Sequence, residues 1–143
     1  MVFPRACLKI GYLLDSNTCI FIIKRKPTVV LKRFRQHLSE GVAISSVTLA
    51  ELRYGADKSS RPTQNHAALD AFLAPVSVVD FDSSAASRYG RVRTDLEHVG
   101  TPIGPLDTMI AAHALSLDLT VVTNNISEFS RGPSLKVEDW TSV

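Results

Sequence analysis

The sequence has few of the features that mark secreted, membrane-bound or disulfide-stabilised proteins. Its 143 residues contain only two cysteines, which is too few for a disulfide framework and favours a reduced, cytoplasmic setting. No apolar run approaches the roughly 18 to 20 residues that a membrane span needs, and the first residues lack the apolar core of a secretory signal. The net charge is only +2, so any basic surface for nucleic acid must be local. We therefore expect a cytoplasmic protein with no membrane partner.

Several catalytic motifs are also missing. The sequence contains no G-x-S-x-G elbow, which disfavours a serine hydrolase, and no glycine-rich loop that would cradle a phosphate. The segment DSNT, which begins at Asp15, supplies no second acid, which disfavours a phosphatase with an aspartyl nucleophile. The composition, with 45% hydrophobic and 21% charged residues, is that of an ordinary globular chain. We expect one domain over residues 12–143, preceded by a leader over residues 1–11 that is possibly disordered.

Short apolar runs alternate with segments of helical periodicity along the chain. The alternation predicts strands over residues 12–15, 42–45, 76–79, 119–123 and 135–138, and helices over residues 16–24, 28–38, 46–56, 65–73, 83–99 and 105–117. Short buried strands separated by helices indicate a mostly parallel α/β sheet of about five strands, with helices on both faces. Ligands of such sheets bind outside the carboxyl ends of the strands.

Acidic residues gather at that predicted edge from separate parts of the chain. Asp15 ends the first strand, and Asp107 lies in the first turn of a helix that must start at the same edge. Glu51 lies about a turn and a half into its helix, and its side chain tilts back toward the helix start. Asn125 follows the fourth strand. The spacing therefore predicts three carboxylates and an amide in one pocket.

Three carboxylates in one pocket repel one another unless a cation joins them. The expected ligands are all oxygens, with no thiol or imidazole among them, and such sets suit Mg²⁺ or Mn²⁺ rather than Zn²⁺. These ions activate water and bind phosphate oxygens, so metal-assisted hydrolysis of a phosphodiester is the chemistry that fits best.

Each of these residues also has a plainer interpretation. Asp15 alone can cap the following helix, and Asp107 alone can be a charge that complements the helix dipole. A glutamate at the edge of an apolar stripe, such as Glu51, is often only solvated, and Asn124–Asn125 alone reads as a turn. It is their joint placement that favours a site.

Basic residues occur in two groups that could contact the phosphates of RNA or DNA. The group that follows the first helix comprises Lys24, Arg25 and Lys26. The group on the helix before Asp107 comprises Arg91 and Arg93. Contacts of this kind provide affinity without sequence choice. An ordinary solvated basic surface explains each group alone equally well.

Five motifs between Tyr12 and Trp140 make the chain similar to a known family. They are LLDSNTCIF, AISSVTLAELRYGADKS, GTPIGPLDTMIAAHAL, VVTNNISEF and VEDW. Together they resemble PIN-domain ribonucleases, and closely the VapC toxins of type II toxin–antitoxin pairs. The resemblance implies a three-layer α/β/α fold in which Asp15, Glu51 and Asp107 are catalytic acids that hold Mg²⁺ or Mn²⁺. It also implies RNA cleavage that leaves 5′-phosphate and 3′-hydroxyl ends.

The resemblance extends to supporting residues, substrate and partners. Asn125 stands where many PIN domains carry a fourth acid, which leaves open whether one metal or two would bind. Thr123 and Asn17 are expected to contact the acids and orient them. The TNN segment followed by EF resembles a VapC branch that cuts initiator tRNA in its anticodon stem-loop. Relatives form homodimers, and a VapB antitoxin inserts a C-terminal segment into the active-site groove and carries the contact to operator DNA.

Two other functions remain compatible with the sequence. One is a catalytically inactive PIN-like module that binds its antitoxin and contributes to operator autoregulation. The other is a metal-dependent phosphatase that acts on small substrates. The response of RNA cleavage to added Mg²⁺ or Mn²⁺ separates the nuclease from the binding module, and turnover of nucleotides without any effect on tRNA would favour the phosphatase.

Overall fold

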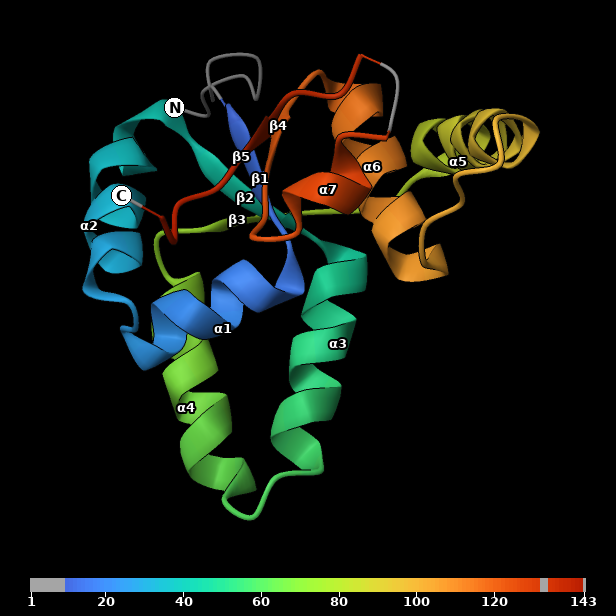
Figure 1. The fold of residues 1–143 in the computed structure, drawn as a ribbon. Coiled ribbons are helices and arrows are strands. Elements are labelled where there is room, and N and C mark those ends of the chain that lie inside the picture. Colours follow the sequence, from blue (N-terminus) through green and yellow to red (C-terminus); the bar gives the residue numbers. More distant parts are fainter. Residues whose placement is uncertain (1–9, 132–133, 143) are drawn as a thin grey trace, which may run out of the picture.

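A parallel sheet forms the centre of the molecule. The structure is a computed structural model that describes residues 10–131 and 134–142. Its strands are β1 (Tyr12–Leu14), β2 (Val42–Ser45), β3 (Ser77–Val79), β4 (Thr120–Val122) and β5 (Val137–Glu138). All neighbouring strands pair in parallel, in the order β3-β2-β1-β4-β5 (Figure 1). The predicted sheet is therefore confirmed, and the carboxyl ends of its strands share one edge.

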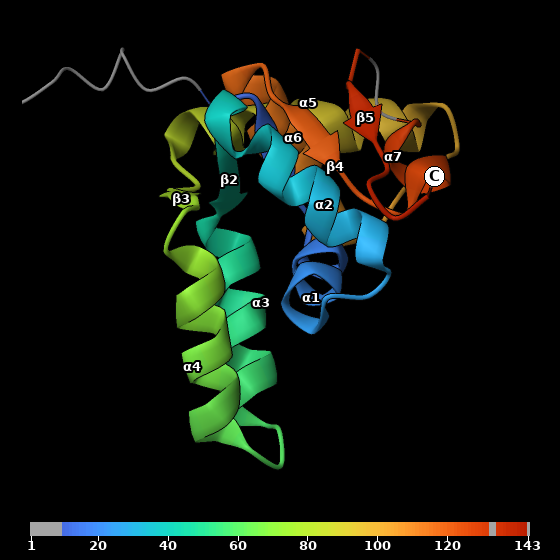
Figure 2. The same ribbon diagram turned by 90° about the vertical axis from the view of Figure 1, so that its left-hand side faces the viewer.

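Helices cover both faces of this sheet. They are α1 (Ser16–Lys24), α2 (Thr28–His37), the short 3-10 helix η2 (Leu38–Glu40), α3 (Ser46–Asp57), α4 (Pro62–Leu73), α5 (Ser83–His98), α6 (Pro105–Leu117) and α7 (Ile126–Phe129). Figures 1 and 2 show α1 and α2 on one side of the sheet and α6, backed by α5, on the other. This is the three-layer α/β/α arrangement that the resemblance implied.

The alternation of side chains along β1 divides the core into two halves. Leu14 joins the cluster beneath α1, α2 and α4, whereas Leu13 joins the cluster beneath α6. Neighbouring residues of a strand point to opposite faces, so a strand buried on both faces must be apolar at every position. Trp140 is buried in the first cluster and packs the end of the chain against it.

The element boundaries differ from the prediction in a few places. Helix α4 begins at Pro62 rather than at residue 65, because a proline costs no hydrogen bond in the first turn of a helix. Helix α7 is an addition to the predicted set, and its four residues are too short for a periodic signal. Of the predicted leader, residues 1–9 lie outside the described residues, but the Gly11 amide donates to the Gly41 carbonyl oxygen at 2.9 Å, which extends the sheet ladder.

Helices α3 and α4, with their connection, form an arm over residues 46–73 that projects beyond the carboxyl edge of the sheet (Figures 1 and 2). Polar side chains tie its two helices together. Arg53 donates from Nη2 to Asp70 Oδ1 at 2.7 Å, and its Nη1 lies 3.1 Å from His66 Nδ1. His66 Nε2 lies 2.7 Å from Asp57 Oδ1. The arm is therefore braced by its own charges.

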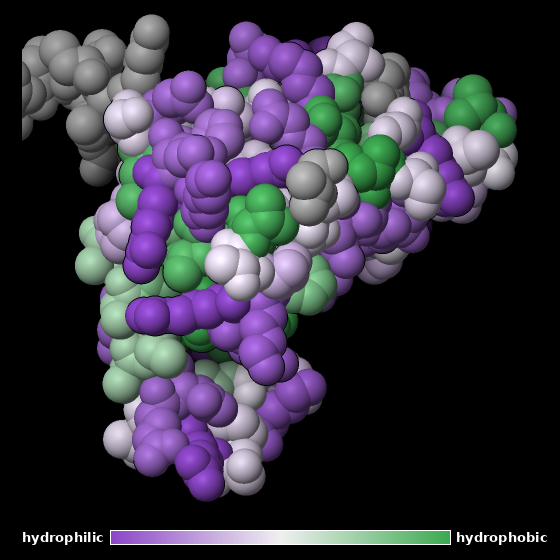
Figure 3. Space-filling view, turned by 60° about the vertical axis from the view of Figure 1, so that its left-hand side comes forward, coloured by the Kyte–Doolittle hydropathy of each residue, from purple (hydrophilic) through white to green (hydrophobic). Residues whose placement is uncertain are grey.

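The surface is mixed in character. Figure 3 shows a mostly hydrophilic face with apolar side chains visible between the polar ones. None of the helices in the described part of the chain combines the length and the apolar character needed to cross a bilayer.

Candidate active site

Asp15 occupies the carboxyl end of β1 and is only 5% exposed. Its Oδ1 accepts a hydrogen bond from the Thr18 amide at 2.8 Å, so it caps α1, as the plainer interpretation expects. Its Oδ2 accepts one from Thr123 Oγ1 at 2.5 Å. Burial raises the pKa of Asp15, and these hydrogen bonds lower it in part. The carboxylate is thus held in one orientation by the first turn of α1 and by the residue that follows β4.

Thr123 links Asp15 to the segment after β4. Its buried hydroxyl donates to Asp15 and accepts from the Asn125 amide at 2.9 Å. Both functions of the hydroxyl are used, so Thr123 and the turn that follows are locked to the acid. The predicted supporting place of Thr123 agrees with this contact.

Asp107 lies in the first turn of α6, at the same edge. Its pKa is raised to about 7, first by burial, then by a hydrogen bond to Glu128 and the charge of Glu128, and further by the charges of Asp15 and Glu51. A proton shared between two carboxyl groups is the expected response of acids that lack a cation. The charges of Asp15 and Glu51 therefore act on Asp107, as their predicted placement at one edge requires.

Glu51 reaches the edge from α3. Its Oε1 accepts a hydrogen bond from Ser16 Oγ at 2.8 Å. Since Ser16 directly follows Asp15, this contact shows that the Glu51 side chain does extend back toward the helix start, as its position predicted.

Glu128 is a fourth carboxylate that the sequence analysis did not identify. It lies on α7 and its Oε2 accepts a hydrogen bond from Asn125 Nδ2 at 2.6 Å. Asn125 stands where many PIN domains carry a fourth acid, and in the structure its amide orients an acid three residues further on. An asparagine followed by a glutamate at that spacing is a helix-start signature, and it could have revealed α7.

The remaining predicted residues are only partly near the acids. Lys24 lines a cavity of about 300 Å³ between α1, α3 and α4 together with Glu51. Arg25 lines a different cavity beside α2, whereas Asn17 and Lys26 are exposed on and after α1. Of the acids, Glu51 thus shares a cavity with Lys24.

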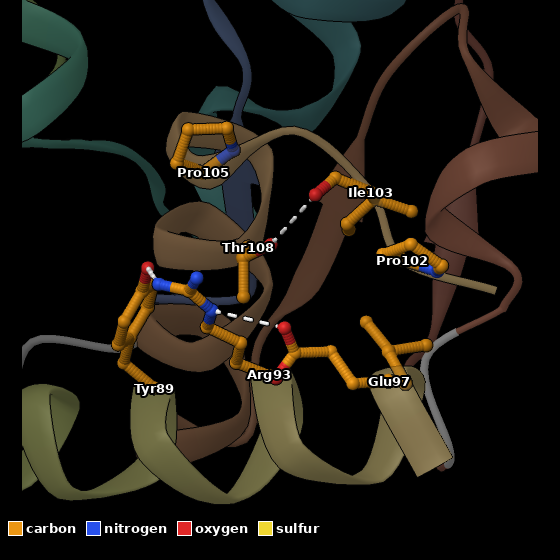
Figure 4. Close-up of a pocket in the computed structure, with 8 residues that line it drawn as sticks. Tyr89, Arg93, Glu97, Pro102, Ile103, Pro105 and Thr108 are labelled. Atoms are coloured by element: carbon orange, nitrogen blue, oxygen red, sulfur yellow. Dashed lines mark hydrogen bonds and ion pairs between the residues drawn. The ribbon is translucent and has the colours of Figure 1, made fainter. Parts of the chain in front are cut away.

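The two arginines of α5 lie apart from this neighbourhood. Arg91 is exposed, and Arg93 donates to Tyr89 Oη at 3.2 Å and pairs with Glu97 at 3.6 Å. Figure 4 shows Arg93 in a pocket of about 230 Å³ against Pro105 and Thr108 of α6. Its guanidinium is therefore committed to α5 and to the side of α6 that faces α5.

The donor set fits a hydrated divalent cation. Within residues 10–131 and 134–142, no three Asp, Glu, His or Cys side chains are gathered closely enough to enclose an ion by themselves. Mg²⁺ is usually bound through one or two carboxylates and retains several waters, so it does not require such a cage. The raised pKa of Asp107 identifies the excess negative charge that the cation would neutralise.

The fold and the acidic edge define a PIN domain, and the model of the PIN domain family matches residues 12–133. The chain is 49% identical over 129 residues to the tRNA(fMet)-specific endonuclease VapC of Salmonella typhimurium, covering 90% of this chain and 97% of that protein. The chain belongs to the VapC family of PIN-domain ribonucleases.

Solved structures agree with this assignment. VapBC2 of Rickettsia felis, bound to a DNA fragment from its promoter, matches with a TM-score of 0.87 at 39% identity, over 92% of this chain and 99% of that one. DNA-bound VapBC of Salmonella typhimurium matches with a TM-score of 0.86 at 48% identity, over 92% of this chain and 98% of that one. Both are complexes of a VapC protein with its antitoxin, so the predicted family is confirmed.

Proposed function

We propose that this VapC protein cleaves RNA with a divalent metal ion, Mg²⁺ or Mn²⁺, held at the carboxyl edge of its sheet. The observation that carries the proposal is the placement of Asp15 at the end of β1, Glu51 hydrogen-bonded to Ser16, and Asp107 in the first turn of α6 at one sheet edge. Burial and the neighbouring acids raise the pKa of Asp107 to about 7, in agreement with this placement. Burial of so many like charges is unfavourable unless a cation binds among them. The intact acids argue against the inactive PIN-like module.

Each acid has a distinct proposed role. Asp15 and Asp107 would hold the metal, and Glu51 would complete its shell directly or through water and orient the attacking water. Glu128, oriented by Asn125, would supply a fourth carboxylate or hold a water of the shell. When bound, the ion would activate water and neutralise charge on the phosphodiester. Thr123 and Ser16 fix the orientation of Asp15 and Glu51 before substrate arrives.

We propose tRNA as the substrate, with the anticodon stem-loop of initiator tRNA as the first choice. The support is the similarity to the Salmonella typhimurium and Shigella flexneri proteins named tRNA(fMet)-specific endonuclease VapC, at 49% and 48% identity. Lys24 would contact a phosphate near Glu51, and the exposed Arg25 and Lys26 phosphates beyond it. Arg91 would contact phosphates farther along the RNA, and Arg93 would do so only by leaving Tyr89 and Glu97.

We propose a VapB-type antitoxin as the protein partner, within a toxin–antitoxin hetero-oligomer that contains a VapC homodimer. The VapBC complexes among the similar structures support this partner. The cavity between α1, α3 and α4 suits a segment of the antitoxin, because apolar Ile20, Ile23 and Leu52 line it beside Lys24 and Glu51. A segment bound there would cover one acid. Operator DNA would be contacted through the antitoxin.

A cleavage assay with purified protein tests this function. Wild-type protein with Mn²⁺ should cut initiator tRNA and leave 5′-phosphate ends, and EDTA should abolish the cut. Asp15→Asn keeps an oxygen that can cap α1, so it should fold and yet lose activity by about 100-fold. Retention of the wild-type rate in Asp15→Asn, or cleavage that is indifferent to EDTA, would refute the proposal. Turnover of small phosphate esters without any effect on RNA would favour the phosphatase.

A further inference from the structure

One face of α3 carries more than the catalytic glutamate. Val47, Glu51 and Tyr54 follow one another at intervals of four and three residues, which places them in one stripe along the helix, and Lys58, the C-cap residue four positions after Tyr54, extends the stripe. Val47 begins the stripe beneath α6, where it packs against the cluster that contains Ile110 and Ala111. The stripe then continues outward along the arm, away from the sheet (Figure 1).

The outer half of this stripe is an exposed aromatic ring with a cation on it. Tyr54 is 65% exposed, although its side chain is large and aromatic. The ammonium of Lys58 lies 4.8 Å from the centroid of the Tyr54 ring. By contrast, the neighbouring Arg53 is bound to Asp70 and His66 of α4. The positive charge of Lys58 is therefore presented on the outer surface of the arm, whereas that of Arg53 braces it.

The spacing along α3 matches a nucleotide that extends from the acids. With a rise of about 1.5 Å per residue, Tyr54 lies roughly 4.5 Å and Lys58 roughly 10.5 Å beyond Glu51 along the helix axis. The Lys58 ammonium lies over one face of the exposed Tyr54 ring, so a base would stack on the opposite face or displace the ammonium toward the adjoining phosphate. The order acid, ring and cation is the order in which an extended strand would meet a cleavage site, a base platform and a phosphate contact.

We propose that Tyr54 and Lys58 form a stacking platform for an unpaired nucleotide of the RNA substrate, next to the scissile phosphate. This inference rests on the proposed ribonuclease function. The platform is separate from the cavity between α1, α3 and α4, because neither Tyr54 nor Lys58 lines that cavity. A loop or single strand fits it, since a base within a duplex has no free face to stack on the ring.

Binding of a labelled single-stranded RNA of about 12 nucleotides, measured in EDTA by fluorescence anisotropy, tests the platform. Tyr54→Ala should weaken binding by about tenfold, and Tyr54→Phe, which keeps the ring, by less than about twofold. Lys58→Ala should lower the slope of log affinity against log salt by about 0.7. Leu117→Ala and Lys32→Ala, at exposed positions on α6 and α2, are matched controls and should bind as the wild type does.

A modified substrate separates stacking from a merely structural effect. An RNA in which the stacked base is replaced by an abasic site should bind the wild type weakly, and Tyr54→Ala should then cause no further loss. The comparison of intact and abasic RNA on the wild type alone stands even if the variant is unstable.

Three results would decide the matter against the platform. The first is that Tyr54→Ala equals the wild type in affinity and in Mn²⁺-dependent cleavage. The second is that its loss of affinity persists on every abasic RNA. A change in the oligomeric mass of Tyr54→Ala at unchanged affinity would instead assign this surface to self-association. If the wild type itself cuts no RNA, the ribonuclease proposal fails first, whereas equal cutting by both proteins overturns the platform alone.

Discussion

Asp57 and Asp70 of the α3–α4 arm are surrounded in the opposite way from the acids of the sheet edge, which include Glu51 at the inner part of the same arm. On the arm, Asp70 meets the Arg53 guanidinium and Asp57 meets the His66 ring, each at 2.7 Å. At the edge, Asp15 is held by an amide and a hydroxyl, and Asp107 faces Glu128. Among the ion pairs of the described residues, none involves an acid of the edge.

This difference separates acids that stabilise the fold from acids that await a ligand. A paired surface carboxylate contributes at most about 1 kcal/mol, and its partner has no other task. Carboxylates that share one buried edge are unfavourable by themselves, and the packed α/β core holds them in place. This arrangement supports the proposal that the edge binds a cation and, through it, a phosphate.

The largest expected difference is in the rate of RNA cleavage, when one acid of each region is replaced by its amide. Asp107→Asn should lower Mn²⁺-dependent RNA cleavage by about 100-fold or more, because even an outer partner of a metal ligand is worth about 10- to 100-fold. Asp70→Asn on the arm should stay within about twofold of the wild type. Initial rates of tRNA cleavage measure both, and equal losses in the two variants would erase the distinction between the regions.

Glu128 provides a sharper test within the edge. Glu128→Gln should lower cleavage by about tenfold, because it keeps the contact with Asn125 but removes the fourth charge. Glu40→Gln, an exposed acid beside His37, is the control and should leave the rate unchanged. If Glu128→Gln cleaves as the wild type does, the acids that matter are the three found from the sequence.

The repulsion at the edge should be visible in stability without metal. The pKa of Asp107 is about 7 in the fold, against an ordinary 3.8. The folded state therefore holds a proton that the unfolded state has lost, and stability falls as pH rises from about 4 to 7. After allowance for solvent screening at this half-buried group, the loss at pH 8 is about 1 to 2 kcal/mol.

Asp107→Asn removes that charge and reverses the loss. In EDTA at pH 8 the variant should melt about 3 °C above the wild type, and the gap should narrow as the pH is lowered toward about 4. Added Mn²⁺ should raise the melting temperature of the wild type and not that of the variant. Scanning calorimetry checks both expectations, and a gap that widens at low pH would contradict the assigned repulsion.

The smallest effect is expected on the arm. Arg53→Met should lower the free energy of unfolding by about 0.5 to 1 kcal/mol, since its contacts with Asp70 and His66 are partly exposed. Cleavage of tRNA should not change. Urea denaturation measures the first quantity, and a large loss of activity at unchanged stability would show that the arm positions Glu51.

Much of the fold could be predicted from the sequence, because its signals are local. Runs such as Val42–Ser45 are apolar at nearly every position, and such runs indicate strands buried on both faces. The edge rule for parallel sheets then placed Asp15, Glu51 and Asp107 together, and in the structure the charges of Asp15 and Glu51 act on Asp107, although the three side chains do not enclose an ion by themselves. Their catalytic and metal-binding roles stay predictions. The position of Arg93 could not be predicted, since helix spacing does not say which neighbour a side chain meets.

The order of amino acids alone determined the parallel sheet, its polar edge and the three acids that end there, because periodicity and capping depend on residues close together in the chain. Only the tertiary structure decided that Glu128 stands beside Asp107, that Thr123 holds Asp15, and that Tyr54 carries Lys58 on an exposed arm. These relations depend on how α7, β4 and α3 pack against distant elements. Packing of that kind is fixed by the whole core and not by any single stretch of sequence.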